Sequence, residues 1–138
     1  MKFDIGWVKR FSNAALAKCL KHPIRKKAVL AGLPGVNVII VSNWVIGKIH
    51  REFMGLDGAT DVITFDHGEI IISAPMAQAN ATRFGKPLEH EIGLYIIHGL
   101  LHLNGYDDKT GQQARVMRKL QESILASCLA SCLPPWIE

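Results

Sequence analysis

Apolar residues follow two spacings along this chain, and these spacings divide it into helical and extended segments. Recurrence at three and four positions, which is typical of helices, occurs over residues 11–20, 44–54, 74–84, 87–104 and 110–132. Short β-branched or apolar runs, which favour strands, occur over residues 36–41, 61–65 and 69–73. Residues 3–8 are interpreted as a first strand, and residues 24–33 as a short basic helix.

The expected strands and helices combine into an α/β (α+β) fold. Residues 61–65 and 69–73 are expected to pair as a hairpin, with the run 70–72 on an edge strand nearest the functional cleft. Residues 36–41 are too few for a helix and are expected to form a central strand. No linker or repeat is visible, so residues 1–138 are predicted to form a single-domain sandwich, with a small mixed four-stranded sheet packed by helices.

Two histidines lie four residues apart within the apolar run 94–103. At 3.6 residues per turn, His98 and His102 share one helix face about 6 Å apart along the axis, as in the metal-site helix of zincins. Gly105 stands where helices often end in a left-handed turn, and a reversed chain could return Asp108 to a metal as third ligand. The alternative is a pair of core histidines, but the glycine and the carboxylate that follow favour a metal site.

Three further residues near this motif have two interpretations each. Asp107 is either an acceptor for a ligating imidazole or a turn-forming residue. Tyr106 either contacts substrate or packs over the loop. Glu91 lies seven residues before His98 and so near its face, but a glutamate in the first turn also stabilises the positive end of a helix.

The composition restricts the class of protein but does not identify a function. The net charge is +4 and the pI near 9.1, which suits a polyanionic partner without requiring one. Three cysteines without a C-x-x-C pair indicate buried thiols rather than a disulfide framework. No secretory signal and no membrane-length apolar run are visible, so a cytoplasmic protein is expected.

The stretch 98–108 reads HGLLHLNGYDD and resembles the motif H-G-x-L-H-L-x-G-Y-D-H of the YbeY family. That family comprises bacterial metal-dependent endoribonucleases of ribosomal RNA maturation and quality control. Residues 60–65, 68–70 and 85–89 resemble further family segments in the same order, and the likeness spans roughly residues 36–125. The resemblance implies the same α/β architecture. It also implies cleavage of single-stranded RNA, with the small ribosomal subunit or its proteins as possible partners.

We expect one zinc ion per chain, or another divalent transition metal, held by His98, His102 and Asp108. The chain departs from the family at two positions that bear on this site. Asp108 replaces a third histidine, which adds negative charge and should weaken the metal as a Lewis acid. Met54 replaces an arginine thought to serve the active site, and Arg51, one turn earlier, is a candidate substitute. A non-catalytic RNA- or ribosome-associated factor is therefore the alternative. A metalloprotease is disfavoured, because Gly99 occupies the place of the H-E-x-x-H general base.

Overall fold

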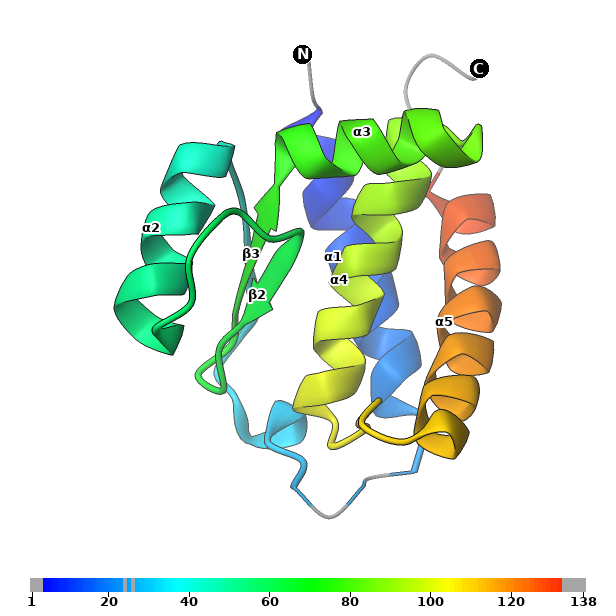
Figure 1. Cartoon of the computed structure of the whole chain (residues 1–138). Coiled ribbons are helices and arrows are strands. Elements are labelled where there is room, and N and C mark those ends of the chain that lie inside the picture. The colour runs from blue at the N-terminus through cyan, green and yellow to red at the C-terminus, as the bar shows by residue number, and fades with distance from the viewer. Residues whose placement is uncertain (1–3, 24, 26, 133–138) are drawn as a thin grey trace.

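The computed structural model describes residues 4–23, 25 and 27–132. In chain order the elements are α1 (Ile5–Leu20), the 3₁₀ turn η1 (Leu30–Gly32), β1 (Asn37–Val41), α2 (Asn43–Met54), β2 (Val62–Thr64), β3 (Glu69–Ser73), α3 (Ala74–Phe84), α4 (Leu88–Leu103) and α5 (Gly111–Ser131) (Figure 1). The helices predicted over 44–54, 74–84, 87–104 and 110–132 are thus confirmed to within about two residues at each end.

The sheet has three strands in the described part of the chain, in the order β1-β3-β2, and not the predicted four. β1 pairs with β3 in parallel, and β2 pairs with β3 in antiparallel, so the sheet is mixed as expected. The prediction of a central 36–41 strand and an edge strand at 70–72 was wrong, because β3 lies in the middle. Ile70, Ile71 and Ile72 are all buried, which requires cover on both faces of the strand.

Helix α1 replaces the predicted first strand. Trp7, Phe11, Ala15 and Cys19 are all buried and lie four residues apart, so the helical stripe continues to the beginning of α1. The prediction was wrong for residues 5–8, and residue 3 lies outside the described residues. The basic helix predicted over 24–33 was also wrong, because the described part of that segment contains only the single turn η1; residues 24 and 26 lie outside the description.

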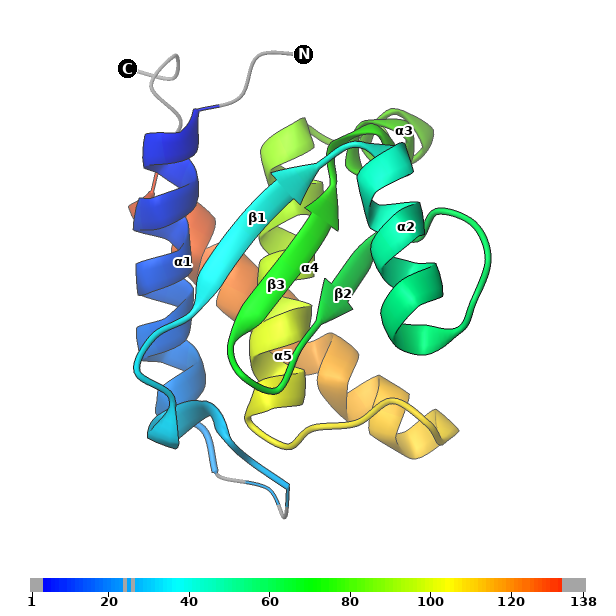
Figure 2. The ribbon, with the colours of Figure 1, turned by 90° about the vertical axis from the view of Figure 1, so that its left-hand side faces the viewer.

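The two faces of the sheet contact different helices, as the side view in Figure 2 shows. Ile70 and Ile72 belong to the main core, which joins the sheet to α1, α4 and α5. Ile71 points the other way and packs with Ile46 of α2 and Ile63 of β2 in a small separate cluster. The result is the expected α/β fold, with helices packed against a small mixed sheet. Among the described residues, each helix is either too short or too polar to cross a membrane.

Helix α4 runs through the middle of the molecule, between α1, α3, α5 and the sheet (Figure 1). Two of its glycines are needed for this packing. A Cβ at Gly93 would lie 2.7 Å from the Phe11 ring, and a Cβ at Gly99 would lie 2.8 Å from Thr64 Oγ1. Real side chains do not approach this closely. Gly99 therefore lets the last turns of α4, which carry both histidines of the motif, lie directly against the sheet.

Candidate metal centre

The last two turns of α4 and the loop after it bring the three predicted ligands together. Nε2 of His98 lies 3.0 Å from Nε2 of His102. One carboxylate oxygen of Asp108 is 3.8 Å from the first nitrogen, and the other is 3.9 Å from the second. One ligand atom from each residue therefore fits within 4.8 Å of the others, so this group can hold a metal ion.

Asp108 returns toward the helix because the chain reverses tightly after Asn104. Gly105 has a φ of 92°, which a residue without Cβ adopts at no steric cost. Backbone hydrogen bonds close the turn, from Gly105 N to His102 O at 3.0 Å and from Tyr106 N to Leu101 O at 2.9 Å. The buried Asn104 side chain donates to Cys19 O at 3.1 Å and ties the turn to α1.

The other nitrogen of each imidazole has its own partner. Nδ1 of His102 lies 3.0 Å from the Tyr106 carbonyl oxygen, and Nδ1 of His98 lies 2.6 Å from Oε1 of Gln121 on α5. A carbonyl oxygen only accepts, so Nδ1 of His102 carries the proton and Nε2 carries a lone pair. Oε1 of Gln121 accepts from Nδ1 of His98 in the same way, so Nε2 of His98 also carries a lone pair. The lone pairs of the two Nε2 atoms therefore face one another beside the Asp108 carboxylate.

This donor set fits a divalent transition metal. Two nitrogens at zinc–nitrogen lengths of about 2.0–2.1 Å around a tetrahedral ion lie about 3.4 Å apart, close to the spacing of the paired Nε2 atoms. The Asp108 carboxylate would have to move closer, because its oxygens lie 3.8 and 3.9 Å from the nearest imidazole nitrogens. Burial lowers the pKa of His102, and His98 beside it lowers it further, against the opposing effect of Asp108. Neutral imidazole, the form that binds metal, is thereby favoured.

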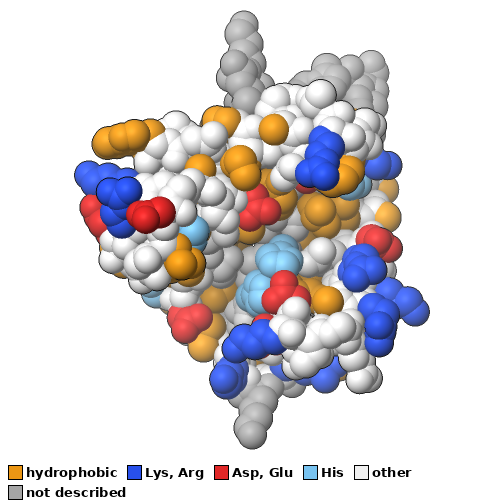
Figure 3. Space-filling model, viewed as in Figure 1, with side chains coloured by type: hydrophobic (Ala, Val, Ile, Leu, Met, Phe, Trp, Pro, Cys, Tyr) orange, Lys and Arg blue, Asp and Glu red, His pale blue; other side chains and the backbone are white. Residues whose placement is uncertain are grey.

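His98 and His102 line a pocket of about 470 Å³, which we call the large pocket. Its lining comes from the end of α4 and the turn after it, from β2 and the turn that follows, from the end of α2 and from the segment before η1: Lys27, Met54, Asp61, Val62, Ile63, Thr64, Asp66, His98, His102, Leu103, Gly105, Tyr106 and Asp107. A second hollow of about 150 Å³, the small pocket, lies toward α5 and shares His98. In the space-filling view the histidines lie in a hollow between the α2 side and the α5 side of the molecule (Figure 3).

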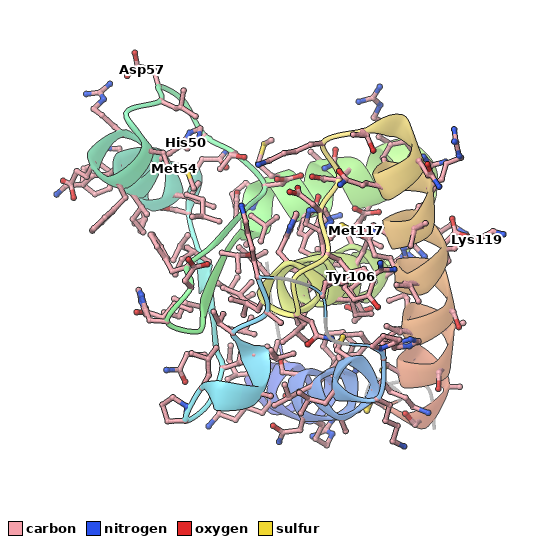
Figure 4. The ribbon with its side chains drawn as sticks, turned by 90° about the horizontal axis from the view of Figure 1, so that it is seen from below. His50, Met54, Asp57, Tyr106, Met117 and Lys119 are labelled. Atoms are coloured by element: carbon pink, nitrogen blue, oxygen red, sulfur yellow. The ribbon has the colours of Figure 1, made fainter. Side chains whose placement is uncertain are left out.

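The structure does not bring Arg51 to this pocket. Its Nε lies 3.1 Å from Oδ1 of Asp57, and both side chains are largely exposed. It lines a different hollow, over the outer face of α2. Met54, by contrast, does line the large pocket. Figure 4 shows Met54 and Asp57 on the α2 side of the molecule, away from Tyr106 and Met117.

The neighbours of the motif have local roles. Asp107 Oδ1 accepts from Asp108 N at 2.9 Å, which lowers the pKa of Asp107 and favours the turn-forming interpretation over an imidazole contact. Tyr106 is buried and its hydroxyl donates to Pro23 O at 3.1 Å, so the packing interpretation describes its ring. Glu91 is buried, with Oε1 3.8 Å from Nδ1 of His90, and is not among the residues that line the large pocket.

Gln121 is the contact that sequence reasoning missed. It lies four residues after Met117 and four before Leu125, both of which are buried on the inward stripe of α5. A polar residue on that stripe was the available signal, since an amide that is withdrawn from water, here a half-buried one, needs a partner. Its partner could not be named from the sequence, because His98 lies 23 residues away.

The fold and the site together define a class: small α/β domains with a candidate metal group at the end of a buried helix. The model of one family, Endoribonuclease YbeY, matches residues 6–129, and the chain belongs to that family. The resemblance noted in the sequence is thereby confirmed.

Individual relatives agree with this assignment. The chain is 44% identical over 87 residues to Endoribonuclease YbeY of Helicobacter pylori (strain ATCC 700392 / 26695), an alignment that covers 57% of this chain and 62% of the relative. The chain thus spans less than two thirds of that protein. It is 34% identical over 135 residues to the protein of the same name from Geobacillus thermodenitrificans, covering 82% of this chain and 86% of the relative.

A solved structure has the same fold. The solution structure of a protein from Thermotoga maritima superposes with a TM-score of 0.69 at 25% identity, over 95% of this chain and 87% of that one. The superposition therefore covers nearly the whole chain.

Proposed function

We propose that this protein is a metal-dependent endoribonuclease that cleaves single-stranded RNA. We place its activity in ribosomal RNA maturation and ribosome quality control in the cytoplasm. The observation that carries the proposal is the pair of Nε2 atoms 3.0 Å apart, with Nδ1 of each ring held elsewhere and Asp108 beside them. Family membership supplies the reaction class.

The ligands we propose are Nε2 of His98, Nε2 of His102 and the Asp108 carboxylate, with zinc as the ion. When bound, such an ion lowers the pKa of a coordinated water toward ~7 and polarises a phosphoryl oxygen. The chain fixes both rings in advance, because the Tyr106 carbonyl and Gln121 hold their Nδ1 atoms. Asp108 brings a negative charge to the set, which lowers the Lewis acidity relative to three imidazoles.

The residue that follows His98 argues against peptide hydrolysis. The position after His98 is a glycine packed against Thr64 and Ile70, so the carboxylate base of H-E-x-x-H proteases has no place there. Peptide hydrolysis by that mechanism is therefore not proposed.

A second function on the same fold is favoured by the composition of the pocket wall. Met54 presents an uncharged side chain to the pocket, and Asp61, Asp66 and Asp107 add negative charge that repels phosphate. Both features reduce transition-state stabilisation for phosphoryl transfer. A non-catalytic factor that binds RNA or the small ribosomal subunit would be compatible with them.

The deciding experiment is cleavage of an end-labelled single-stranded RNA by zinc-loaded protein purified without a metal-binding tag. We expect slow endonucleolytic cleavage that His102→Ala and a chelator both abolish. His67→Ala, an exposed histidine on the turn between β2 and β3, serves as the matched control and should cleave like wild type. RNA binding without any cleavage would favour the non-catalytic factor. Cleavage that survives in His102→Ala would place the activity elsewhere or in a contaminant.

A further inference from the structure

The candidate metal group lies between two hollows, and each hollow has one cation. Lys27 lines the large pocket, and Arg118 lines the small pocket together with His98 and Asp108. Among the described residues that line these two hollows, no other lysine or arginine occurs. In Figure 3 the histidines and a red acidic side chain lie between blue basic side chains below them and blue side chains on the α5 side.

Arg25 and Val29, which lie on either side of Lys27, bind the backbone at the end of α4. Arg25 N donates to Asn104 O at 3.2 Å, and Val29 N donates to Leu103 O at 2.8 Å. A Cβ at Gly105 would lie 2.8 Å from the Arg25 Cβ, so the two segments are in direct contact. The backbone on both sides of Lys27 is therefore tied to the end of α4, which carries the proposed histidine ligands.

Arg118 is fixed by α5, the helix that also provides Gln121. The two residues lie three positions apart, so they share one side of the helix, and both line the small pocket with His98. Lys119, the next residue, points outward from α5 in Figure 4. The helix thus presents one basic side chain to the metal group and the adjacent one to solvent.

Neither cation is neutralised by a neighbour. Within the described part of the chain, neither Lys27 nor Arg118 has a carboxylate oxygen within 4.0 Å. Other cations do, such as Arg51 with Asp57 at 3.1 Å and Lys109 with Asp107 at 3.6 Å. An unpaired lysine or arginine beside a pocket is available to bind an external anion.

We propose that a single RNA strand crosses the metal group, with one phosphate bound by Lys27 in the large pocket and another bound by Arg118 in the small pocket. The phosphodiester between these two contacts then faces His98, His102 and Asp108. The acidic lining of the large pocket makes the contact with Lys27 necessary, because a phosphate entering beside Asp61 and Asp66 is otherwise repelled. This proposal rests on the proposed function and assigns the substrate path to that site.

The test is the salt dependence of RNA binding. Binding of a labelled 2′-O-methyl oligouridine, which lacks a free 2′-hydroxyl, is measured over a range of KCl concentrations for zinc-loaded wild type, Lys27→Ala, Arg118→Ala and the double variant. Each phosphate contact on a single strand contributes about 0.7 to the slope of log K against log salt. We therefore expect each single variant to lower the slope by about 0.7, the double variant to lower it by about 1.4, and zinc content to stay unchanged. Lys119→Ala is the charge-matched control and should keep the wild-type slope.

Cleavage of unmodified RNA is measured in parallel, so that two failures can be told apart. If wild type binds and cleaves RNA but Lys27→Ala and Arg118→Ala both match Lys119→Ala, the strand path is wrong and the proposed function stands. If the slopes fall as expected but nothing is cleaved, the path stands and the nuclease proposal falls. Wild type that does not bind the oligonucleotide overturns both. Circular dichroism and melting temperature check that the variants are folded, and Lys27→Gln repeats the test with a side chain of similar length.

Discussion

The two walls of the large pocket are built in different ways. The metal wall, residues 98–108, begins in the most buried helix of the molecule and ends in a turn tied to α1 and to the segment before η1. The other side, which we call the α2 wall, is the segment 43–61, of which Met54 and Asp61 line the pocket. It rests on a small cluster of Ile46, Ile63 and Ile71 and leaves Trp44 and Phe53 largely exposed. The metal wall is fixed by the main core, whereas the α2 wall lies at the periphery and packs on the small cluster.

This difference indicates which properties each wall controls. A metal site requires ligands held within a few tenths of an ångström, and only the metal wall has the packing and hydrogen bonds for that. The α2 wall can change its side chains at little cost in stability, because most of them contact solvent rather than the core. Metal binding should therefore depend on the metal wall. The rate of RNA cleavage, by contrast, should respond to substitutions on the α2 wall.

The largest expected contrast between the walls is in stability, at two glycines that both have positive φ. At Gly105 a Cβ would lie 2.9 Å from the Arg25 carbonyl oxygen, whereas at Gly55 it would meet nothing within 4 Å. Gly55→Ala should cost only the backbone strain, about 1–2 kcal/mol. Gly105→Ala adds overpacking and should cost about 2–5 kcal/mol. Urea unfolding of the two variants measures the loss in free energy of unfolding. An equal loss in both variants would contradict the difference in packing between the two walls.

A smaller effect is expected at Gln121, which supports the metal wall from α5. Gln121→Ala removes the acceptor from Nδ1 of His98 and should weaken zinc affinity about 10–100-fold, as is usual when the partner of a ligand is lost. Gln121→Glu keeps an acceptor oxygen and should retain the affinity. Gln112→Ala, in the exposed first turn of α5, is the control. A competition titration with a zinc indicator measures all of them; unchanged affinity in Gln121→Ala would mean that the ring is held by packing alone.

The smallest expected effect belongs to the α2 wall. Met54→Arg places a cation on the lining of the large pocket and should raise RNA cleavage several-fold without changing zinc content. Leu56→Arg adds the same charge to an exposed residue that does not line the pocket, and it should leave the rate unchanged. Initial rates under single-turnover conditions compare the two. If both variants accelerate cleavage equally, the gain comes from net charge rather than from position.

The metal wall was also the part of the site that the sequence predicted best. His98 and His102 were found from their four-residue spacing, and Gly105 indicated the reversal that brings Asp108 back. These features depend on helix geometry and on one turn, so they are local and can be predicted from neighbouring residues.

Features that depend on long-range packing were missed or misplaced. Gln121 reaches His98 only because α5 packs beside α4, and Lys27 reaches the pocket through backbone hydrogen bonds to the end of α4. The predicted strand order was wrong because a run of three isoleucines suits any strand that is buried on both faces. Such a run does not indicate which other strands lie beside it. The spacing of Trp7, Phe11 and Ala15 did contain the helical signal, but the strand interpretation of residues 3–8 overlooked it.

The central claim is that His98, His102 and Asp108 together bind one divalent ion, and a chelator-competition titration at fixed pH tests it most directly. Wild type is compared with Asp108→Ala, Asp108→His and the double variant His98→Ala/His102→Ala, all purified without a metal-binding tag. We expect about one zinc per wild-type chain, none in the double variant, and a loss in Asp108→Ala beyond the ~10–100-fold of an indirect contact. Asp108→His should retain or tighten binding, because imidazole is a good zinc ligand. A double variant that keeps the wild-type metal, or equal affinities in wild type and Asp108→Ala, would contradict the claim.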